Sequence, residues 1–290
     1  MSPTGNPVRV IVLAAQRPGV INPLAARFGV SHKCLVPLAG KPLIAHVLAA
    51  ISKSHAVGSV AISVEPDSFE TIDRAVCRDS LPRVEFMPAA SSLADSVLIA
   101  AGQHAGPLIV TTADHALLDP ASITRLSEAL SRHDVVFAMA PREAVMAAHP
   151  DGQRRFYRFR GGQFSNCNLY GISGPEALRA AEIFRGGGQF AKRAGRIIEA
   201  FGLLNLMLLR LRMLSLPQAA RRISSRIGLN VAALVLDDGN QAIDVDNDRT
   251  YSVVAQILTV RHLSDCQPLP LAAPHGTLGG MPADRERLRA

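Results

Sequence analysis

Two positively charged side chains follow the first apolar stretch of the sequence, and their position suits them to phosphate binding. Residues 8–14 form a β-branched apolar run of strand length, and Arg17 and Lys33 come after it. An unbroken apolar strand is typical of a parallel sheet that is buried on both faces. In such sheets, ligands bind beyond the carboxyl ends of the strands. We therefore expect Arg17 and Lys33 to lie where a phosphate group would bind.

Carboxylates stand at two further places that could carry chemistry. Asp114 ends an apolar strand, which places it at the same edge of a parallel sheet. Asp244 and Asp246 alternate with Ile243 and Val245, so the two carboxylates are expected on one face and the two apolar side chains in the core. The alternatives are a turn-forming or helix-capping role for Asp114 and a solvated, self-capping turn for the second pair.

Two pairs of uncharged polar residues are also candidates for hydrogen bonds with a ligand. Ser91 and Ser92 precede a helical stretch, where a serine is also an ordinary N-cap. Asn166 and Asn168 alternate along a predicted strand, so that both amides can point at one ligand. Turn-forming asparagines are the alternative for the second pair.

The elements that must position these residues alternate between strand and helix, which indicates a parallel α/β sheet. Pro42 stands at the expected start of the first long helix, as proline often does. Residues 141–155 are polar and are expected to form a loop. The expected strands are 8–14, 34–38, 57–64, 84–87, 107–113, 134–139, 164–172 and 231–236. The expected helices include 42–52, 67–76, 121–132, one that starts at Ser173 and one from about 247.

These motifs resemble those of the MobA-like and IspD-like nucleotidyltransferases. That group opens with a Leu-Ala-Gly-Gly loop, an arginine, a lysine, and a Leu-x-Gly-x-Pro-Leu turn; this chain has Leu13-Ala14-Ala15, Arg17, Lys33 and residues 38–43 in that order. The strand ending at Asp114 and the segment with Asp244 and Asp246 resemble two further family motifs. The chain departs from the pattern where Ala14, Ala15 and Gln16 replace glycines, which let a backbone approach a phosphate closely.

The resemblance implies a three-layer, Rossmann-like α/β fold of the GT-A type, with a mostly parallel sheet, and it implies roles for the residues above. Lys33 and Arg17 would be catalytic. Mg²⁺ would be held by Asp114 and Asp246, with Asp244 in support, because this hard cation prefers carboxylate and phosphate oxygens. The acceptor would meet Asn166 and Asn168. The nucleotide would meet Leu13, Ala14, Ala15, Gln16, Ser91 and Ser92.

The activity implied by the resemblance is transfer of a nucleoside monophosphate group from a nucleoside triphosphate, with CTP or GTP favoured. The acceptor would be a phosphorylated small molecule or headgroup, and pyrophosphate would be released. Two alternatives are a GT-A glycosyltransferase that uses a nucleotide sugar and a non-catalytic nucleotide-binding protein. The first would carry an Asp-x-Asp motif in mid-chain, where this sequence has only Asp114; the second is suggested by the glycine-poor loop.

The composition of the chain narrows the classes of partner, metal site and cellular location that remain to be considered. The chain has 290 residues, 48% of them hydrophobic, a formal net charge of +7 and only 4% aromatics. A nucleic-acid surface needs stacking aromatics beside its positive charge, so we expect no nucleic-acid partner. The four cysteines are far apart, which predicts reduced thiols rather than a zinc site. No signal peptide or membrane-spanning stretch is recognised, and we expect a cytoplasmic protein.

The domain organisation expected from the sequence is a nucleotidyltransferase domain at 1–265, a helical insert at about 186–228 and a disordered tail at 266–290. Residues 201–226 are apolar with interspersed arginines. They predict either an insert packed on the sheet or a basic amphipathic surface resting on anionic lipid, at the inner face of a membrane. Residues 154–160 alternate arginines with aromatics and predict an edge strand that is solvated or faces an anionic acceptor.

Overall fold

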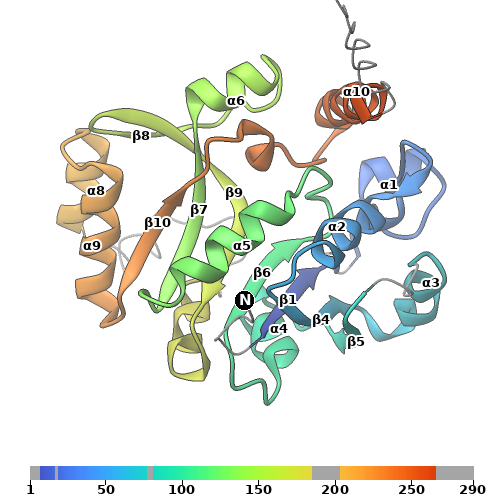
Figure 1. The fold of residues 1–290 in the computed structure, drawn as a ribbon, viewed down its shortest axis with the longest axis horizontal. Helices are drawn as coiled ribbons and strands as arrows, with labels where there is room; N and C mark the ends of the chain where they lie inside the picture. Colours follow the sequence, from blue (N-terminus) through green and yellow to red (C-terminus); the bar gives the residue numbers. More distant parts are fainter. Residues whose placement is uncertain (1–6, 17–18, 77–80, 185–202, 266–290) are drawn as a thin grey trace, which may run out of the picture.

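The computed structural model describes residues 7–16, 19–76, 81–184 and 203–265, and these form a mixed α/β fold around an eight-stranded sheet (Figure 1). Seven strands follow the order β10-β7-β9-β6-β1-β4-β5, and β8 pairs with β9. A separate two-stranded ribbon joins β2 (Pro37–Leu38) and β3 (Lys41–Pro42). The strands of the main sheet are β1 (Val8–Leu13), β4 (Val57–Val64), β5 (Arg83–Pro88), β6 (Leu108–Thr112), β7 (Val135–Pro141), β8 (Tyr157–Phe159), β9 (Gly162–Ile172) and β10 (Val231–Val235).

Helices cover both faces of this sheet, which gives the three layers expected from the sequence. The α-helices are α1 (Pro23–Arg27), α2 (Leu43–Ser52), α3 (Phe69–Arg74), α4 (Leu93–Ala101), α5 (Pro120–Ala129), α6 (Arg142–Ala148), α8 (Leu203–Arg210), α9 (Leu216–Ile227) and α10 (Asp248–Asp265). The 3₁₀ helices are η1 (Lys33–Leu35), η2 (Pro66–Ser68), η3 (Pro175–Phe184) and η5 (Gly239–Ala242). No helix among these described segments is long and apolar enough to cross a bilayer.

The central strand β1 shows why an unbroken apolar run forms here. Val10 and Val12 face a core shared with α2 and α5, while Ile11 faces a second core shared with α4 and η3. Successive side chains of a strand point to opposite faces, so the part of the strand covered on both sides, Val10 to Leu13, is apolar at every position. β1 pairs in parallel with both β4 and β6, so that all three strands end at the same edge.

Strand β9 is the exception to the parallel order. It runs antiparallel between β6 and β7, and its register on β7 shifts between Phe137 and Met139. Asn168 lies opposite this irregularity with a φ of 45°, in the left-handed region that asparagine tolerates better than most residues. Because Val110 pairs with Tyr170, Asn168 lies beside the carboxyl end of β6.

Three expectations about local structure were wrong. Residues 34–38 form the end of η1 and the two-residue strand β2, because the chain turns at once into the β2–β3 ribbon. Residues 142–148, expected in a loop, form helix α6, in which buried Val145 packs into the main core. The helix expected from Ser173 is the 3₁₀ helix η3. The first part of the predicted insert and the predicted tail, 185–202 and 266–290, lie outside the described residues.

A buried arginine interrupts the apolar pattern of β1 and is paired on both sides. The Arg9 guanidinium donates through Nε to the carbonyl of Ala100 at 2.9 Å and through Nη2 to Glu85 Oε2 at 2.6 Å. The hydrogen bond from Arg9, together with its charge, holds the pKa of the Glu85 carboxyl below its ordinary value against the opposing effect of burial. Removing the carboxylate leaves a nearly buried guanidinium without its anion.

Glu85→Gln is therefore expected to lower the free energy of unfolding at pH 7 by about 1–2 kcal/mol. Because the folded-state pKa of Glu85 is depressed, this stabilisation is present above the unfolded-state pKa and is lost as the pH falls through the folded-state pKa. Urea unfolding of both proteins from pH 7 downward measures the difference.

The matched control is Glu70→Gln, which removes an exposed ion pair with Arg74 on helix α3. Exposed pairs contribute little, so that variant should differ from the wild type by less than about 0.5 kcal/mol at every pH. A Glu85→Gln difference that stayed constant down to the acid limit would contradict the pKa assignment.

Candidate functional site

The candidate site lies at the edge where β1, β4 and β6 end. Leu13 pairs with Ser63 of β4 and Thr112 of β6. Beyond these pairs, the backbone amide of Ala14 donates to the carbonyl of Ser63, and the amide of Ala113 donates to that of Leu13. The loops that begin at Ala14, Glu65 and Ala113 therefore start side by side, which brings residues far apart in the sequence to one place.

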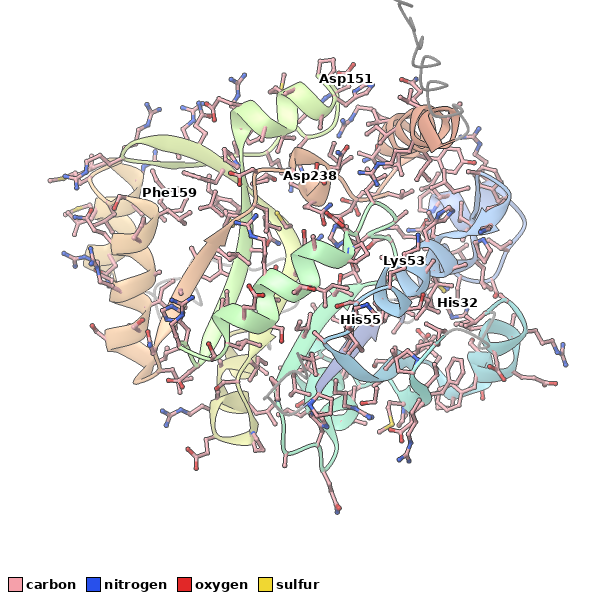
Figure 2. The ribbon with its side chains drawn as sticks, in the orientation of Figure 1. His32, Lys53, His55, Asp151, Phe159 and Asp238 are labelled. Atoms are coloured by element: carbon pink, nitrogen blue, oxygen red, sulfur yellow. The ribbon has the colours of Figure 1, made fainter. Side chains whose placement is uncertain are left out.

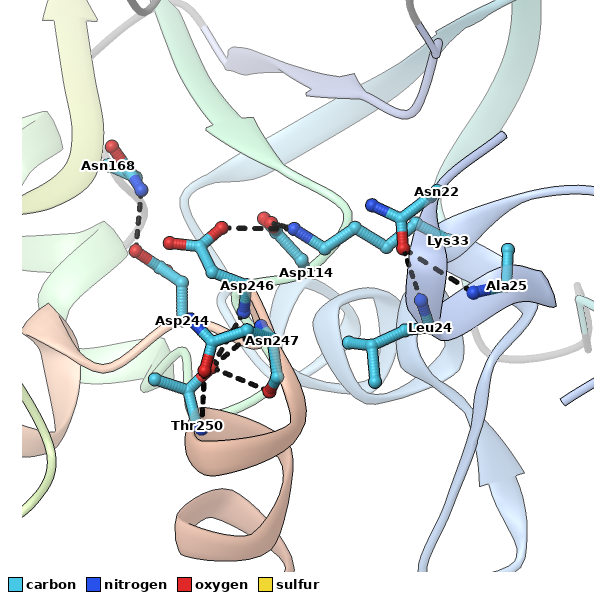
Figure 3. Close-up of polar contacts among 10 residues, drawn as sticks. All are labelled: Asn22, Leu24, Ala25, Lys33, Asp114, Asn168, Asp244, Asp246, Asn247 and Thr250. Carbon is cyan, nitrogen blue, oxygen red and sulfur yellow. Dashed lines mark hydrogen bonds and ion pairs between the residues drawn. The ribbon is translucent and has the colours of Figure 1, made fainter. Parts of the chain in front are cut away.

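Lys33 lies at the centre of this site and contacts two carboxylates (Figure 3). Its ammonium donates a short hydrogen bond to Asp114 Oδ2 and a second one to Asp246 Oδ1 at 3.1 Å. The side chains of Lys33 and Asp114 are only 19% and 16% exposed, whereas Asp246 is 66% exposed. The structure thus brings together three residues that the sequence analysis selected from separate motifs.

The charges of this cluster stabilise one another. Burial lowers the pKa of Lys33, but the adjacent Asp114 and Asp246 carboxylates outweigh this effect and raise it above its ordinary value. Burial raises the pKa of Asp114, and the Lys33 charge and hydrogen bond outweigh that effect in turn, so the pKa is lowered. At neutral pH the Lys33 ammonium and the Asp114 carboxylate are therefore both charged.

Asp244 is the third acid of the site, and its environment differs from that of Asp246. It is buried, as are its neighbours Ile243 and Val245. Burial and the nearby charges of Asp114 and Asp246 raise the pKa of Asp244 well above its ordinary value. The predicted placement of both apolar neighbours in the core is correct, but Asp244 lies beneath the surface while Asp246 reaches solvent.

The two asparagines of β9 form a connected chain that ends at this acid. Asn166 Nδ2 donates to Asn168 Oδ1 at 2.7 Å and to the hydroxyl of Tyr170 at 2.6 Å. Asn168 Nδ2 donates to Asp244 Oδ2 at 2.5 Å, as Figure 3 shows. The two amides lie on one side of the strand, as their alternation predicted, and the left-handed backbone at Asn168 accompanies this arrangement.

A glutamine that sequence reasoning did not select holds the two acidic loops together. Gln241 is fully buried, and its Nε2 donates to the carbonyl of Leu117 at 3.0 Å and to Asp238 Oδ2 at 2.9 Å. Its Oε1 accepts from the backbone amide of Asp119. Nothing in the sequence marks Gln241, because a buried amide cannot be told from an exposed one without the tertiary contacts.

A second network connects the glycine-poor loop to the segment that carries Lys33. The backbone amide of Gln16 donates to Glu65 Oε1 at 2.8 Å, and the other carboxylate oxygen lies 3.2 Å from His32 Nε2. The Gln16 side chain donates to the carbonyl of Ser31 at 2.6 Å. Sequence reasoning missed Glu65 and His32, although Glu65 follows strand β4 directly, much as Asp114 closely follows β6.

Most of the other residues predicted from the sequence lie at the end of β1 or at the start of α4. Ser92 is the N-cap of α4, and its hydroxyl accepts from the backbone amide of Asp95, while Ser91 is exposed beside it. Leu13 and Ala14 end β1 and begin the loop, with Ala14 buried and Ala15 exposed. Arg17 lies outside the described residues.

The oxygen atoms of this site suit a hard divalent cation such as Mg²⁺. Asp114 Oδ1 and Asp244 Oδ1 are buried carboxylate oxygens with no hydrogen-bond partner, and each has a lone pair available. The described ranges contain no group of three or more histidine, cysteine, aspartate or glutamate side chains already arranged around a metal position. Mg²⁺ often binds through one or two carboxylates together with substrate phosphates, so the site fits that mode of binding.

Comparison with known proteins gives one family and several structures of similar fold. The family model described as the MobA-like NTP transferase domain matches residues 10–200. No protein of curated function matches the sequence. A hypothetical transferase from Thermus thermophilus is 24% identical, with a TM-score of 0.70, over 84% of this chain and 99% of that one.

Two more distant structures share the fold. A CMP:2-keto-3-deoxy-manno-octonic acid synthetase complexed with CTP is 13% identical, with a TM-score of 0.55, over 88% of this chain and 100% of that one. A 4-diphosphocytidyl-2C-methyl-D-erythritol synthase from Anaerococcus prevotii is 9% identical, with a TM-score of 0.54, over 88% and 97% of the two chains. The Rossmann-like fold predicted from the sequence is thus confirmed.

Gln241→Ala tests whether this buried amide holds the acidic loops. The substitution removes three hydrogen bonds and leaves the part-buried backbone amide of Asp119 without this partner, so we expect the free energy of unfolding to fall by about 2–4 kcal/mol. Gln256→Ala, on the exposed face of α10, is the control and should cost less than about 0.5 kcal/mol. Chemical denaturation measures both, and equal effects of the two substitutions would contradict the role of Gln241.

Proposed function

Since the chain belongs to the MobA-like NTP transferase family, we propose that it transfers a nucleoside monophosphate group from a nucleoside triphosphate to a phosphorylated acceptor. The observation that carries this proposal is the contact of one lysine with two carboxylates from separate loops, Lys33 with Asp114 and Asp246. A triphosphate needs both kinds of charge: an ammonium for its oxygens and carboxylates for the accompanying cation.

The reaction follows from these charges. An oxygen of the acceptor phosphate attacks the α-phosphorus of the nucleotide, and the bond from that phosphorus to the bridging oxygen breaks on the opposite side. Pyrophosphate leaves with the electron pair of the broken bond. An ionised acceptor phosphate has no proton to remove, so no general base is required. Lys33 and Arg17 stabilise the charge on the reacting centre and the leaving group.

Mg²⁺ would be held by Asp114 and Asp246, with Asp244 nearby, and would neutralise charge on the triphosphate when bound. Lys33 itself provides positive charge for both carboxylates. The ammonium is thus positioned for phosphate contact before the substrates arrive, and this preorganisation lowers the cost of ordering it during the reaction.

The two ends of the site suit the two substrates. Ala14, Ala15 and Gln16 with Ser91 and Ser92 would line the nucleotide, while Asn166 and Asn168 would face the acceptor. The Gln16 amide already donates to Glu65, so phosphate recognition in this loop depends more on Lys33 and Arg17 than on backbone amides. CTP and GTP are the favoured nucleotides, and CTP is tested first because the synthetase of similar fold described above is complexed with CTP.

The intact cluster favours catalysis over the non-catalytic alternative. Burying a carboxylate or bringing two carboxylates close together costs free energy, and the Lys33 ammonium offsets part of that cost. Loss of Lys33 or of either carboxylate would have favoured the non-catalytic alternative, and all three residues are present.

Asp114→Ala is expected to lower Mg²⁺-dependent pyrophosphate release at least about 100-fold, because it removes a carboxylate at the point where charge develops. Release is measured with each of the four ribonucleoside triphosphates against sugar phosphates, polyol phosphates and phosphorylated lipid headgroups. Unfolding by heat checks that the variant is folded.

The matched control is Asp237→Ala, which removes an exposed aspartate paired with Arg125 outside the cluster. It should retain wild-type turnover. Full activity of Asp114→Ala with the active substrate pair would remove Asp114 from the proposed metal site.

A further inference from the structure

A basic and apolar surface lies at the end of the molecule away from the candidate site. It is formed by strand β8, helix α8, helix α9 and the turn between the helices, which gather on one side of the sheet in Figure 1. The amide of Arg160 donates to the carbonyl of Leu214 at 2.8 Å, and its side chain donates to Gln218 Oε1 at 3.2 Å. These bonds join the β8–β9 hairpin to the helical pair, and Figure 2 shows Phe159 beside α8.

The charge of this surface has a single sign. Residues 157–163 contain two arginines and residues 203–236 contain five, and neither range contains an aspartate, a glutamate or a lysine. The seven arginines are Arg158, Arg160, Arg210, Arg212, Arg221, Arg222 and Arg226. A surface of one sign attracts a partner with the opposite charge.

Large apolar side chains are exposed among these arginines. Met207, Leu211, Met213 and Tyr157 are each more than half exposed to solvent. Met207 and Leu211 stand four residues apart, at the end of α8 and just beyond it, so they share one side of this helical stretch. Apolar side chains exposed beside arginines are typical of surfaces that enter the boundary between lipid headgroups and acyl chains.

A hollow between the hairpin and the end of α8 adds a place for a phosphate group. Its volume is about 390 Å³, and it is lined by Arg158, Phe159, Gly162, Gln163 and Arg212. Arg212 has a φ of 58°, an uncommon conformation for a residue other than glycine. Two arginines lining one hollow suit a phosphate, which a guanidinium group binds through paired hydrogen bonds.

We propose that this surface binds an anionic phospholipid bilayer, with a lipid phosphate in the hollow between Arg158 and Arg212 and the side chains of Met207 and Leu211 in the interface. Three of the four exposed apolar side chains, Met207, Leu211 and Met213, are not aromatic and offer no ring for base stacking, which favours this partner over nucleic acid. The proposal does not rest on nucleotidyl transfer, because vesicle binding is measured without nucleotide.

The test is co-sedimentation of the full chain with vesicles of phosphatidylcholine alone or mixed with about one-third phosphatidylglycerol. The wild type should bind the anionic vesicles at least about tenfold more tightly than the neutral ones, and added salt should weaken the binding because it screens the arginines. Arg158→Glu with Arg212→Glu should weaken it at least about tenfold. Met207→Ser with Leu211→Ser should weaken it while leaving the charge unchanged.

The control is Lys53→Glu with Arg74→Glu, which changes the net charge by the same amount as the arginine variant, at the residue after α2 and on α3. Lys53 lies far from Phe159 in Figure 2, and this variant should bind anionic vesicles like the wild type. Thermal unfolding shows that all variants are folded. Equal binding to neutral vesicles, equal loss in the control, no binding to vesicles, or binding to single-stranded RNA in place of vesicles would each overturn the proposal.

Discussion

The arrangement of the candidate site depends on one buried ammonium group between two carboxylates. Lys33 and Asp114 lie largely out of contact with water, where an unpaired charge is costly. Each therefore requires the other, and Asp246 completes the cluster from the opposite loop. Because the three residues come from three separate parts of the chain, their mutual attraction also fixes how the loops at the carboxyl edge of the sheet meet.

The rest of the fold can be understood as support for this cluster. Parallel pairing of β1 with β4 and β6 aligns the starts of three loops. Gln241 joins the loop of Asp114 to the segment that leads to Asp246, and the amide of Val245 donates to the carbonyl of Asp114 at 3.2 Å. The antiparallel strand β9 brings Asn168 to the same edge. The arginines of β8, α8 and α9 lie at the other end of the molecule, where we propose that they bind an anionic bilayer.

The sequence predicted those parts of the structure that depend on local pattern. Apolar runs identified the long strands, and the strand-end rule placed Lys33 and Asp114 at one edge before any contact was known. The sequence pattern could not reveal that helix α6 forms within a polar stretch. This helix is stabilised by a tertiary contact, the packing of Val145 into the main core. The same limit hid Glu65 and Gln241, whose importance lies only in the groups they meet across the fold.

The most direct test of nucleotide binding at this site is thermal unfolding of the purified protein with ATP, CTP, GTP and UTP, each with and without Mg²⁺, and with nucleotide diphosphate sugars. A ligand that binds only the folded state raises the Tm, and the rise grows with its affinity and concentration. We expect one nucleotide, CTP or GTP, to raise the Tm and the rise to require Mg²⁺, because the carboxylates of Asp114 and Asp246 need a cation to accept a triphosphate beside them. Shifts with nucleotide sugars alone, or no shift with any nucleotide, would contradict it.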